Sequence, residues 1–221
     1  MLSDRLRVLY LHGFASSPAS RKGQFFAAGF RSRGLQLEIP DLAEGDFEHL
    51  TITRQLQVVE RLLDGAPAAL IGSSLGGYLA ALYASYHPEI HRLILLAPAF
   101  DFYHLWLSSL GRETVASWKR NRTTPVFNYA GSCEMPLDFE FIRDAARFPP
   151  FPHFLQSALL FHGNHDSLVP LQHSLLFAAA HPNVRLFRLD SGHELTDVLD
   201  AIWLESQGFV LDERPGSKVI D

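Results

Sequence analysis

The chain has 221 residues, of which 47% are hydrophobic and 19% charged, which supplies a normal core and excludes disorder over most of its length. Its 19 basic and 24 acidic residues give a formal net charge of −5, which disfavours a nucleic-acid partner because such partners bind basic surfaces. The single cysteine, Cys133, excludes an intramolecular disulfide and a metal site with two thiolate ligands.

The predicted elements alternate between short apolar strands and longer helical segments. Continuous apolar runs are typical of strands buried on both faces, and they predict strands at 8–11, 35–39, 68–72, 93–97, 158–161 and 184–189. Apolar residues at helical spacing predict helices at 51–64, 75–86, 171–180 and 195–206. Strands separated by helices form parallel βαβ units. We therefore expect a single α/β domain over 1–221, with a doubly wound, mostly parallel sheet.

The segment from about 100 to 156 interrupts this alternation. It is too long for an ordinary connection in a compact domain, and its many aromatic residues oppose disorder. We expect a lid insertion here that is partly helical, at 109–120 and 138–147, and folded over one edge of the sheet. A polar tail is expected at about 212–221.

A candidate nucleophile lies in Gly72-Ser73-Ser74-Leu75-Gly76, which matches the pattern G-x-S-x-G. The match falls directly after an apolar strand and directly before a helix, where such a turn projects its central serine from the carboxyl end of a sheet. Glycine at both ends lets neighbouring backbone pass closely. Ser74 is therefore the candidate nucleophile, and a plain glycine-rich connection between strand and helix is the alternative.

Two residues downstream have the order and position of partners for this serine. A serine nucleophile needs a base, and the base needs an acid that orients it; after such a turn the chain order is Ser, Asp or Glu, then His. Asp166 follows the strand at 158–161 and His193 follows the strand at 184–189. We predict a triad of Ser74, His193 and Asp166. A helix cap is the alternative role for Asp166, and Asp190 the alternative acid.

Acyl transfer also requires N–H donors for the oxyanion. The residue after the nucleophile, Leu75, is expected to supply one backbone N–H. The turn after the first strand, His12-Gly13-Phe14, is expected to supply the other from Phe14. The alternative is a turn glycine followed by a phenylalanine that only fills the core.

Together these motifs resemble the α/β-hydrolase superfamily over nearly the whole chain. The N-terminal half, through Leu11–Lys22 and Gly72–Tyr78, is similar to the YqiA/YcfP-type small bacterial esterases. This resemblance implies a serine hydrolase without a cofactor that acts on acyl esters or thioesters. The sequence departs from that group at Glu194, which follows His193 where an alanine is more usual.

The aromatic residues of the 100–156 segment bear on the substrate. An apolar lid over a serine predicts an apolar pocket for an acyl chain or an aromatic ester. We expect Phe102, Trp106 and Trp118 to line it. The alternative is that these rings form the segment's own small core, since aromatic side chains dominate the buried area of any small core.

Other classes of function compete with this hypothesis. Zinc could be held by residues near strand ends, namely His12, His162, His165, Asp166 and His193. The same fold also serves non-catalytic ligand-binding proteins, carbon–carbon bond hydrolases and perhydrolases. We expect a small-molecule ester or thioester substrate of small to medium acyl size, no metal or other cofactor, and no nucleic-acid partner. The single cysteine and the lack of a long apolar run predict a cytoplasmic protein without stable membrane insertion.

Overall fold

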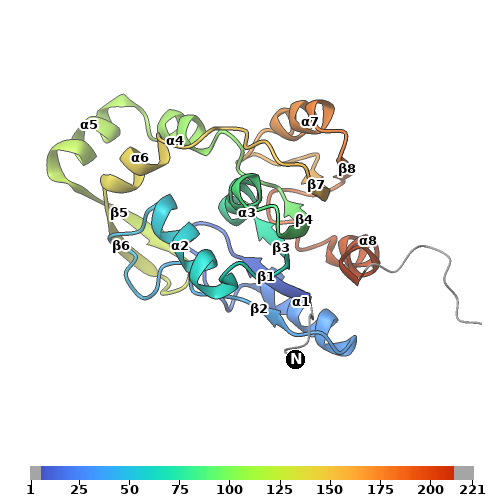
Figure 1. Cartoon of the computed structure of the whole chain (residues 1–221). Helices are drawn as coiled ribbons and strands as arrows, with labels where there is room; N and C mark the ends of the chain where they lie inside the picture. The colour runs from blue at the N-terminus through green and yellow to red at the C-terminus, as the bar shows by residue number, and fades with distance from the viewer. Residues whose placement is uncertain (1–5, 212–221) are drawn as a thin grey trace, which may run out of the picture.

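Six parallel strands form the central sheet (Figure 1). Across the sheet their order is β2 (Leu37–Glu38), β1 (Arg7–Leu11), β3 (Ala68–Ser73), β4 (Ile90–Leu96), β7 (Ser157–Gly163) and β8 (Val184–Leu189). The chain first moves from β1 to β2 and then crosses back to β3, so the sheet is wound in both directions from its middle. The computed structural model describes residues 6–211, and the tail predicted at 212–221 lies outside them. The predicted α/β class is confirmed.

Helices cover both faces of this sheet. On one face α1 (Arg21–Ser32) and α8 (Leu199–Leu211) pack together against strand residues such as Val8 and Tyr10. On the other face α2 (Ile52–Leu63), α3 (Leu75–Tyr86) and α7 (Leu171–Ala180) pack against the alternate residues, such as Leu9 and Leu11. Successive strand residues point to opposite faces, so burial of both faces explains the continuous apolar runs. Within 6–211, no helix is long and apolar enough to cross a membrane.

Two helices depart from the predicted pattern. Helix α1 was not predicted, because two glycines weaken its helical signal. One of them, Gly29, is required by packing, since a Cβ there would lie 2.8 Å from the Trp203 ring of α8. Helix α8 begins at Leu199 rather than at 195, because Leu195 has a φ of 53° and makes a turn before the helix.

The 100–156 segment contains more structure than the two predicted helices. Its elements are α4 (Phe102–Leu110), α5 (Arg112–Asn121), β5 (Thr123–Asn128), β6 (Cys133–Asp138) and α6 (Glu140–Ala145). The helix predicted at 109–120 is wrong in its start, because Gly111 has a φ of 77° and separates α4 from α5. The antiparallel hairpin of β5 and β6 was missed. Each of its strands contains a proline, Pro125 paired with Pro136, and proline is depleted in strands.

This segment packs against the α2 and α3 side of the sheet (Figure 1). Its hairpin is tied to the loop after β1, where the Tyr129 amide donates to the Ala15 carbonyl at 2.9 Å. Its last part is tied to α3, where the Tyr78 hydroxyl donates to the Pro149 carbonyl at 2.9 Å. The segment therefore lies next to the loops that follow the carboxyl ends of the central strands.

Candidate active site

Ser74 occupies a sharp turn between β3 and α3. Its backbone has φ 54° and ψ −118°, a combination that costs a non-glycine residue about 1–3 kcal/mol. The turn is possible because both flanking glycines lack a Cβ. At Gly72 a Cβ would lie 2.2 Å from the Gly76 carbonyl oxygen, and at Gly76 it would lie 2.0 Å from the Leu11 carbonyl oxygen. The predicted strand–turn–helix context of the G-x-S-x-G pattern is thus observed.

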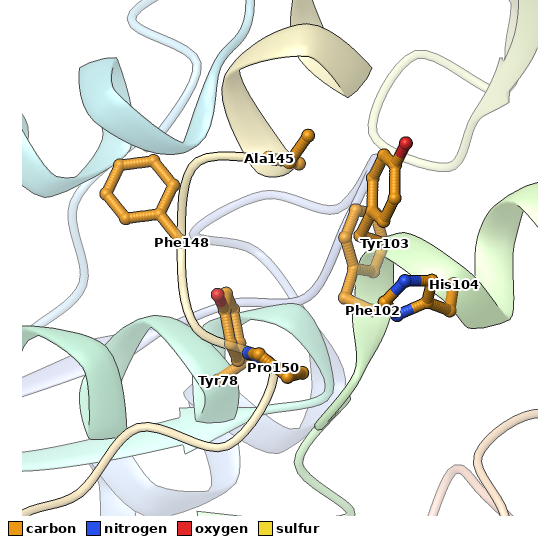
Figure 2. A pocket seen from close by; sticks show the side chains of 8 residues that line it. Tyr78, Phe102, Tyr103, His104, Ala145, Phe148 and Pro150 are labelled. Carbon is orange, nitrogen blue, oxygen red and sulfur yellow. The ribbon is translucent and has the colours of Figure 1, made fainter.

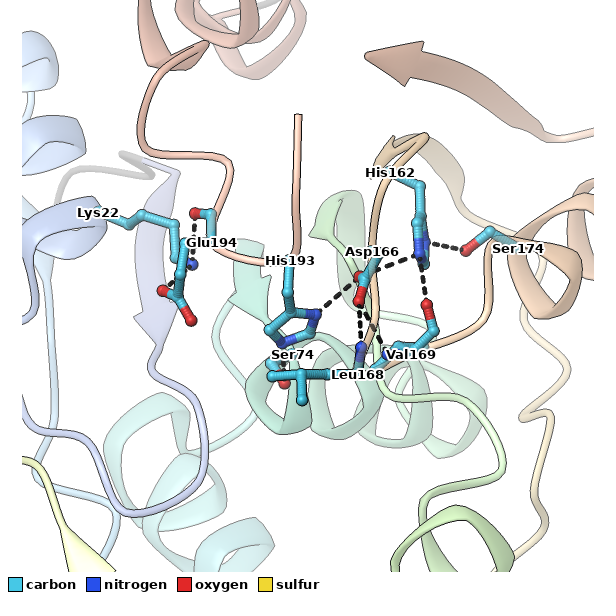
Figure 3. Close-up of polar contacts among 9 residues, drawn as sticks. All are labelled: Lys22, Ser74, His162, Asp166, Leu168, Val169, Ser174, His193 and Glu194. Carbon is cyan, nitrogen blue, oxygen red and sulfur yellow. Dashed lines mark hydrogen bonds and ion pairs between the residues drawn. The ribbon is translucent and has the colours of Figure 1, made fainter. Parts of the chain in front are cut away.

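The three predicted triad residues lie in hydrogen-bond contact (Figure 3). The distance from His193 Nε2 to Ser74 Oγ is 3.0 Å, and the distance from His193 Nδ1 to Asp166 Oδ2 is 2.7 Å. A carboxylate only accepts hydrogen bonds, so Nδ1 carries the imidazole proton. Nε2 of the neutral ring is then the acceptor for the Ser74 hydroxyl.

The loops after β7 and β8 bring Asp166 and His193 together. They pass so closely that a Cβ at Gly163 would lie 2.3 Å from the Ser191 carbonyl oxygen. The His165 amide donates to that same carbonyl at 3.0 Å. Two adjacent strand ends therefore hold the acid and the histidine in fixed relation. The competing acid Asp190 has a side chain that is 90% exposed and contacts His165 instead.

The environment of Asp166 favours its charged form. Its side chain is fully buried, and its Oδ1 accepts from the amides of Leu168 at 2.9 Å and Val169 at 2.8 Å. Burial raises the pKa of Asp166, but hydrogen bonds from His162, His193 and the Val169 amide more than offset this and hold that pKa well below its usual range. Asp166 does not cap α7, the alternative role considered for it, because the N-cap of that helix is Pro170 and no side chain caps it; the two amides that Asp166 binds lie in the loop before the helix.

A second histidine that the triad prediction missed contacts the same carboxylate. His162, on β7, is fully buried, and its Nε2 lies 3.2 Å from Asp166 Oδ2 and 3.0 Å from the Val169 carbonyl oxygen. Both are acceptors, so Nε2 carries a proton. Its Nδ1 lies 2.8 Å from the Ser174 hydroxyl of α7. The motif His162-Gly163 at the strand end could be recognised in the sequence. A sequence motif alone, however, does not reveal that the His162 ring contacts Asp166.

The turn after β1 lies directly beside the serine. A Cβ at Gly13 would lie 3.5 Å from the Ser74 Cβ. His12 fixes this turn, because its buried ring contacts the Gly13 carbonyl oxygen through Nδ1 at 3.0 Å and accepts from the Leu42 amide through Nε2 at 3.2 Å. Burial lowers the pKa of His12, against a smaller opposite effect of the bond to Gly13. Within residues 6–211, no hydrogen-bond acceptor is found for the amides of Phe14 and Leu75.

The Phe14 ring joins this turn to the 100–156 segment. Its centroid lies 4.9 Å from the Trp106 ring and 6.4 Å from the Phe102 ring. Trp118, which was expected to line a substrate pocket, is instead 1% exposed and donates from Nε1 to the Leu137 carbonyl at 2.8 Å. Trp118 thus belongs to the segment's own core, as the alternative interpretation had it.

A cavity of about 150 Å³ opens between α3 and the 100–156 segment (Figure 2). Phe102 lines it, together with Tyr78, which lies one helical turn after Ser74 on α3. The remaining lining residues are Tyr103, His104, Ala145, Ala146, Phe148 and Pro150. A second, more open groove of about 670 Å³ has a polar lining that includes Lys119, Arg122 and Arg143. Trp106 and Trp118 line neither of the two.

Two histidines of the competing zinc hypothesis have partners other than Asp166. His165 contacts Asp190 at 2.7 Å with a side chain that is 70% exposed, and His12 is bonded to backbone groups away from Asp166. In the part of the chain that the structure describes, no group of three or more His, Cys, Asp or Glu side chains is placed to hold a metal ion.

Comparison with known proteins gives a family and a fold. The sequence profile of a family described as "Uncharacterised protein family (UPF0227)" matches residues 7–205. Among curated proteins no significant match is found.

Similar solved structures extend over nearly the whole chain. The α/β hydrolase domain-containing protein 10 from mouse is 22% identical, with a TM-score of 0.77 over 94% of this chain and 90% of that one. Est1E from Butyrivibrio proteoclasticus is 19% identical, with a TM-score of 0.79 over 96% of this chain and 91% of that one in its ferulic acid complex. A structure from work on the metagenome-derived lipolytic enzymes LipS and LipT is 20% identical, with a TM-score of 0.70 over 94% of both chains. The α/β-hydrolase fold that this resemblance implies is confirmed.

Proposed function

The chain belongs to the UPF0227 family and has the α/β-hydrolase fold, and from this premise we propose that it is a serine hydrolase of carboxylic esters or thioesters. One observation carries the proposal: the 3.0 Å contact between Ser74 Oγ and His193 Nε2, made by a serine held on a strained turn. Strained backbone persists where the surrounding structure fixes it, and it is concentrated at functional sites.

In the proposed reaction Ser74 Oγ attacks the acyl carbonyl carbon while His193 Nε2 takes its proton. The imidazolium formed in this step is stabilised by Asp166, which accepts from Nδ1 and remains ionised. The low pKa of Asp166 supports this role, because the acid must stay charged while its neighbour gains a proton. His193 then donates the proton to the leaving alcohol or thiol, and an acyl-enzyme remains on Ser74.

The oxyanion of each tetrahedral intermediate would be stabilised by the backbone N–H groups of Phe14 and Leu75. Gly13 places the turn before Phe14 beside Ser74, and Leu75 is the first residue of α3. Donors that are already fixed near the developing charge need no reorganisation during the reaction. In the second half of the cycle, His193 activates a water that releases the acid and restores Ser74.

We assign the cavity between α3 and the 100–156 segment to the acyl or aromatic part of the substrate. Its lining is largely aromatic, and Phe102 links it through a ring contact to Phe14 beside the serine. The 100–156 segment thus acts as the lid, with Phe102 at the substrate and Trp106 behind it. A similar structure from work on lipolytic enzymes and the Est1E complex with ferulic acid support an acyl ester as the substrate, and we propose a small to medium acyl group.

The proposal includes the absence of a metal or other cofactor, because the serine, histidine and aspartate supply nucleophile, base and acid between them. It also includes a cytoplasmic location, for which the single cysteine is the ground. The domain is proposed to be single, because the segments before and after the lid contribute strands to one sheet.

Hydrolysis of a p-nitrophenyl ester series, from acetate to palmitate, tests the proposal. We expect the wild type to show a chain-length optimum and Ser74→Ala to lose about 10⁴-fold or more in kcat. Ser73→Ala is the matched control, since it removes the neighbouring hydroxyl from β3 and leaves the contact of Ser74 with His193 in place. Wild-type rates in Ser74→Ala would contradict the mechanism.

A serine-reactive phosphonate separates the remaining possibilities. Labelling of Ser74 in a protein that hydrolyses no ester of the series would direct the search to thioesters or to carbon–carbon bond cleavage. Failure to label, together with failure to hydrolyse, would favour a ligand-binding protein with this fold.

A further inference from the structure

Lys22 contacts the loop of His193 on the side away from Asp166 (Figure 3). Its Nζ donates to the backbone carbonyl oxygen of Glu194 at 2.8 Å and lies 3.2 Å from Oε2 of the same residue. Glu194 directly follows His193, whereas Lys22 lies 172 positions away in sequence, in the first turn of α1. The contact therefore joins a distant helix to the peptide next to the candidate base.

This position is unfavourable for a cation in two ways. The N-terminal turn of a helix carries partial positive charge, and α1 has no acidic residue in its first turn. The Lys22 side chain is also only 10% exposed; burial lowers its pKa, and Glu194 partly restores it. A lysine here does not serve the stability of α1, so its role lies with its partner.

The partner is at the start of a strained turn. Leu195, the next residue, has a φ of 53° and is 1% exposed, and a bulky residue in this left-handed region costs about 1–2 kcal/mol. The carbonyl that Lys22 binds belongs to the peptide between Glu194 and Leu195. Lys22, which lies outside the loop, thus holds the strained turn. His193, the residue before Glu194, is held with it. Unlike the buried Leu195, Glu194 has a side chain that is 73% exposed. The Glu194 side chain therefore does not contribute to the core.

We propose that Lys22 is a positioning residue of the active site: it fixes the peptide between Glu194 and Leu195 so that the His193 imidazole keeps its distance to Ser74, and Glu194 keeps the ammonium group in place. The inference rests on the proposed function for its effect on catalysis. Its structural part, the fixation of the turn at Glu194 and Leu195, stands independently of it.

The pair also places a cation and a carboxylate at the residue that follows His193. His193 contacts Asp166, with His162 behind it. The Lys22–Glu194 pair is at the residue that follows His193, and the Tyr10 hydroxyl lies in the field of Glu194. Removing the cation leaves the Glu194 carboxylate unbalanced and favours the protonated imidazole. Removing the Glu194 carboxylate leaves the Lys22 cation unbalanced and disfavours the protonated imidazole. The two changes should shift the acid limb of the pH–rate profile in opposite directions.

The test compares Lys22→Met, Lys22→Arg and Glu194→Gln with wild type on p-nitrophenyl acetate. For Lys22→Met we expect kcat to fall about tenfold to a hundredfold, as for a misplaced catalytic group, with KM nearly unchanged and the acid limb moved to higher pH. Lys22→Arg, which keeps charge and donors, should retain most of the wild-type kcat, and Glu194→Gln should move the acid limb to lower pH. Lys119→Met, an exposed lysine on α5, is the matched control and should behave as wild type.

A merely structural role would lower the melting temperature of Lys22→Met and leave kcat and the pH profile unchanged, which would overturn the proposal. Amide hydrogen exchange over 191–197 gives a second measurement that needs no substrate. Faster exchange there in Lys22→Met supports the proposal, and unchanged exchange overturns it. If Lys22→Met fails to fold, Glu194→Gln provides the test. A shift of its acid limb to lower pH supports the proposal, and an unchanged acid limb overturns it. Ester hydrolysis by wild type but not by Ser74→Ala judges the proposed function separately, whatever happens at Lys22.

Discussion

His162 and His193 contact the same carboxylate oxygen, Oδ2 of Asp166, at 3.2 and 2.7 Å. The other oxygen, Oδ1, accepts the amides of Leu168 and Val169. The carboxylate is therefore held on both oxygens while it orients one imidazole. All of these partners donate to it, and each stabilises its ionised form.

Replacing this acid should abolish most of the activity. Asp166→Asn introduces an amide that can donate to His193 Nδ1, which favours the wrong tautomer and leaves Nε2 protonated. We expect kcat to fall about 10⁴-fold, the size of effect seen when a triad acid is amidated, measured with p-nitrophenyl acetate. The control is Asp190→Asn, an exposed carboxylate close to His193 in sequence. A loss in Asp190→Asn and none in Asp166→Asn would reverse the two assignments.

The same carboxylate should make stability depend on acid pH. Because its folded-state pKa lies below the unfolded value of about 3.9, the unfolded chain binds the proton first as the pH falls. The stability that Asp166 contributes is present above about pH 4 and is lost as the pH falls toward the folded-state pKa. Urea unfolding between about pH 2 and 6 should show a shallower loss of unfolding free energy in Asp166→Asn than in wild type. Equal slopes would contradict the ionised, bonded carboxylate.

The nucleophile turn should tolerate no Cβ at its second glycine. In Gly76→Ala the new methyl group would lie 2.0 Å from the Leu11 carbonyl oxygen and 2.5 Å from that of His12, and backbone cannot move aside as a flexible side chain does. We expect a loss of about 3 kcal/mol or more in unfolding free energy, the upper range for overpacking, measured by urea denaturation. Gly192→Ala is the control, because nothing lies within 4 Å of its Cβ position. Equal stability of the two variants would contradict the close approach of α3 to β1.

The sheet and the positions of the candidate triad residues could be predicted because both depend on local patterns. Apolar runs marked the strands, and the positions just after them marked Asp166 and His193, since parallel strands end at one edge of the sheet. Contacts between distant residues have no such pattern. His162 lies four residues from Asp166, but its shared contact depends on how the loop after β7 turns. The contact of Lys22 with Glu194 spans 172 positions.

The extent of the 100–156 segment was predicted better than its helices and strands. Its aromatic content indicated an ordered segment, yet periodicity does not distinguish a ring that lines a pocket from one that fills a core. In the structure Phe102 lines the cavity, whereas Trp118 is buried in the core. The hairpin was missed because Pro125 and Pro136, which pair with each other, occur where strand patterns disfavour proline.

A buried carboxylate of the 100–156 segment should stabilise α2. Asp144, on α6, accepts from the amide and from the hydroxyl of Thr53, both at 2.7 Å. The Thr53 amide is one of the free donors in the first turn of α2. Asp144→Ala should therefore lower the unfolding free energy by about 2 kcal/mol, because it leaves that donor without a partner. The control is Glu140→Ala on the same helix, which removes only an exposed contact with Arg143 and should change stability by about 0.5 kcal/mol or less.

The cavity predicts how substrate preference responds to the size of one ring. Phe102→Ala removes a side chain that lines the cavity and contacts Phe14, so the pocket should accept longer acyl chains. Each methylene that it newly buries is worth about 0.8 kcal/mol, or about fourfold in kcat/KM, and the optimum in the p-nitrophenyl ester series should move to longer chains while acetate loses rate. Phe127→Ala, on the exposed hairpin, removes the same ring away from the cavity and should leave the optimum in place. An optimum that moves in Phe127→Ala and not in Phe102→Ala would place the acyl chain elsewhere.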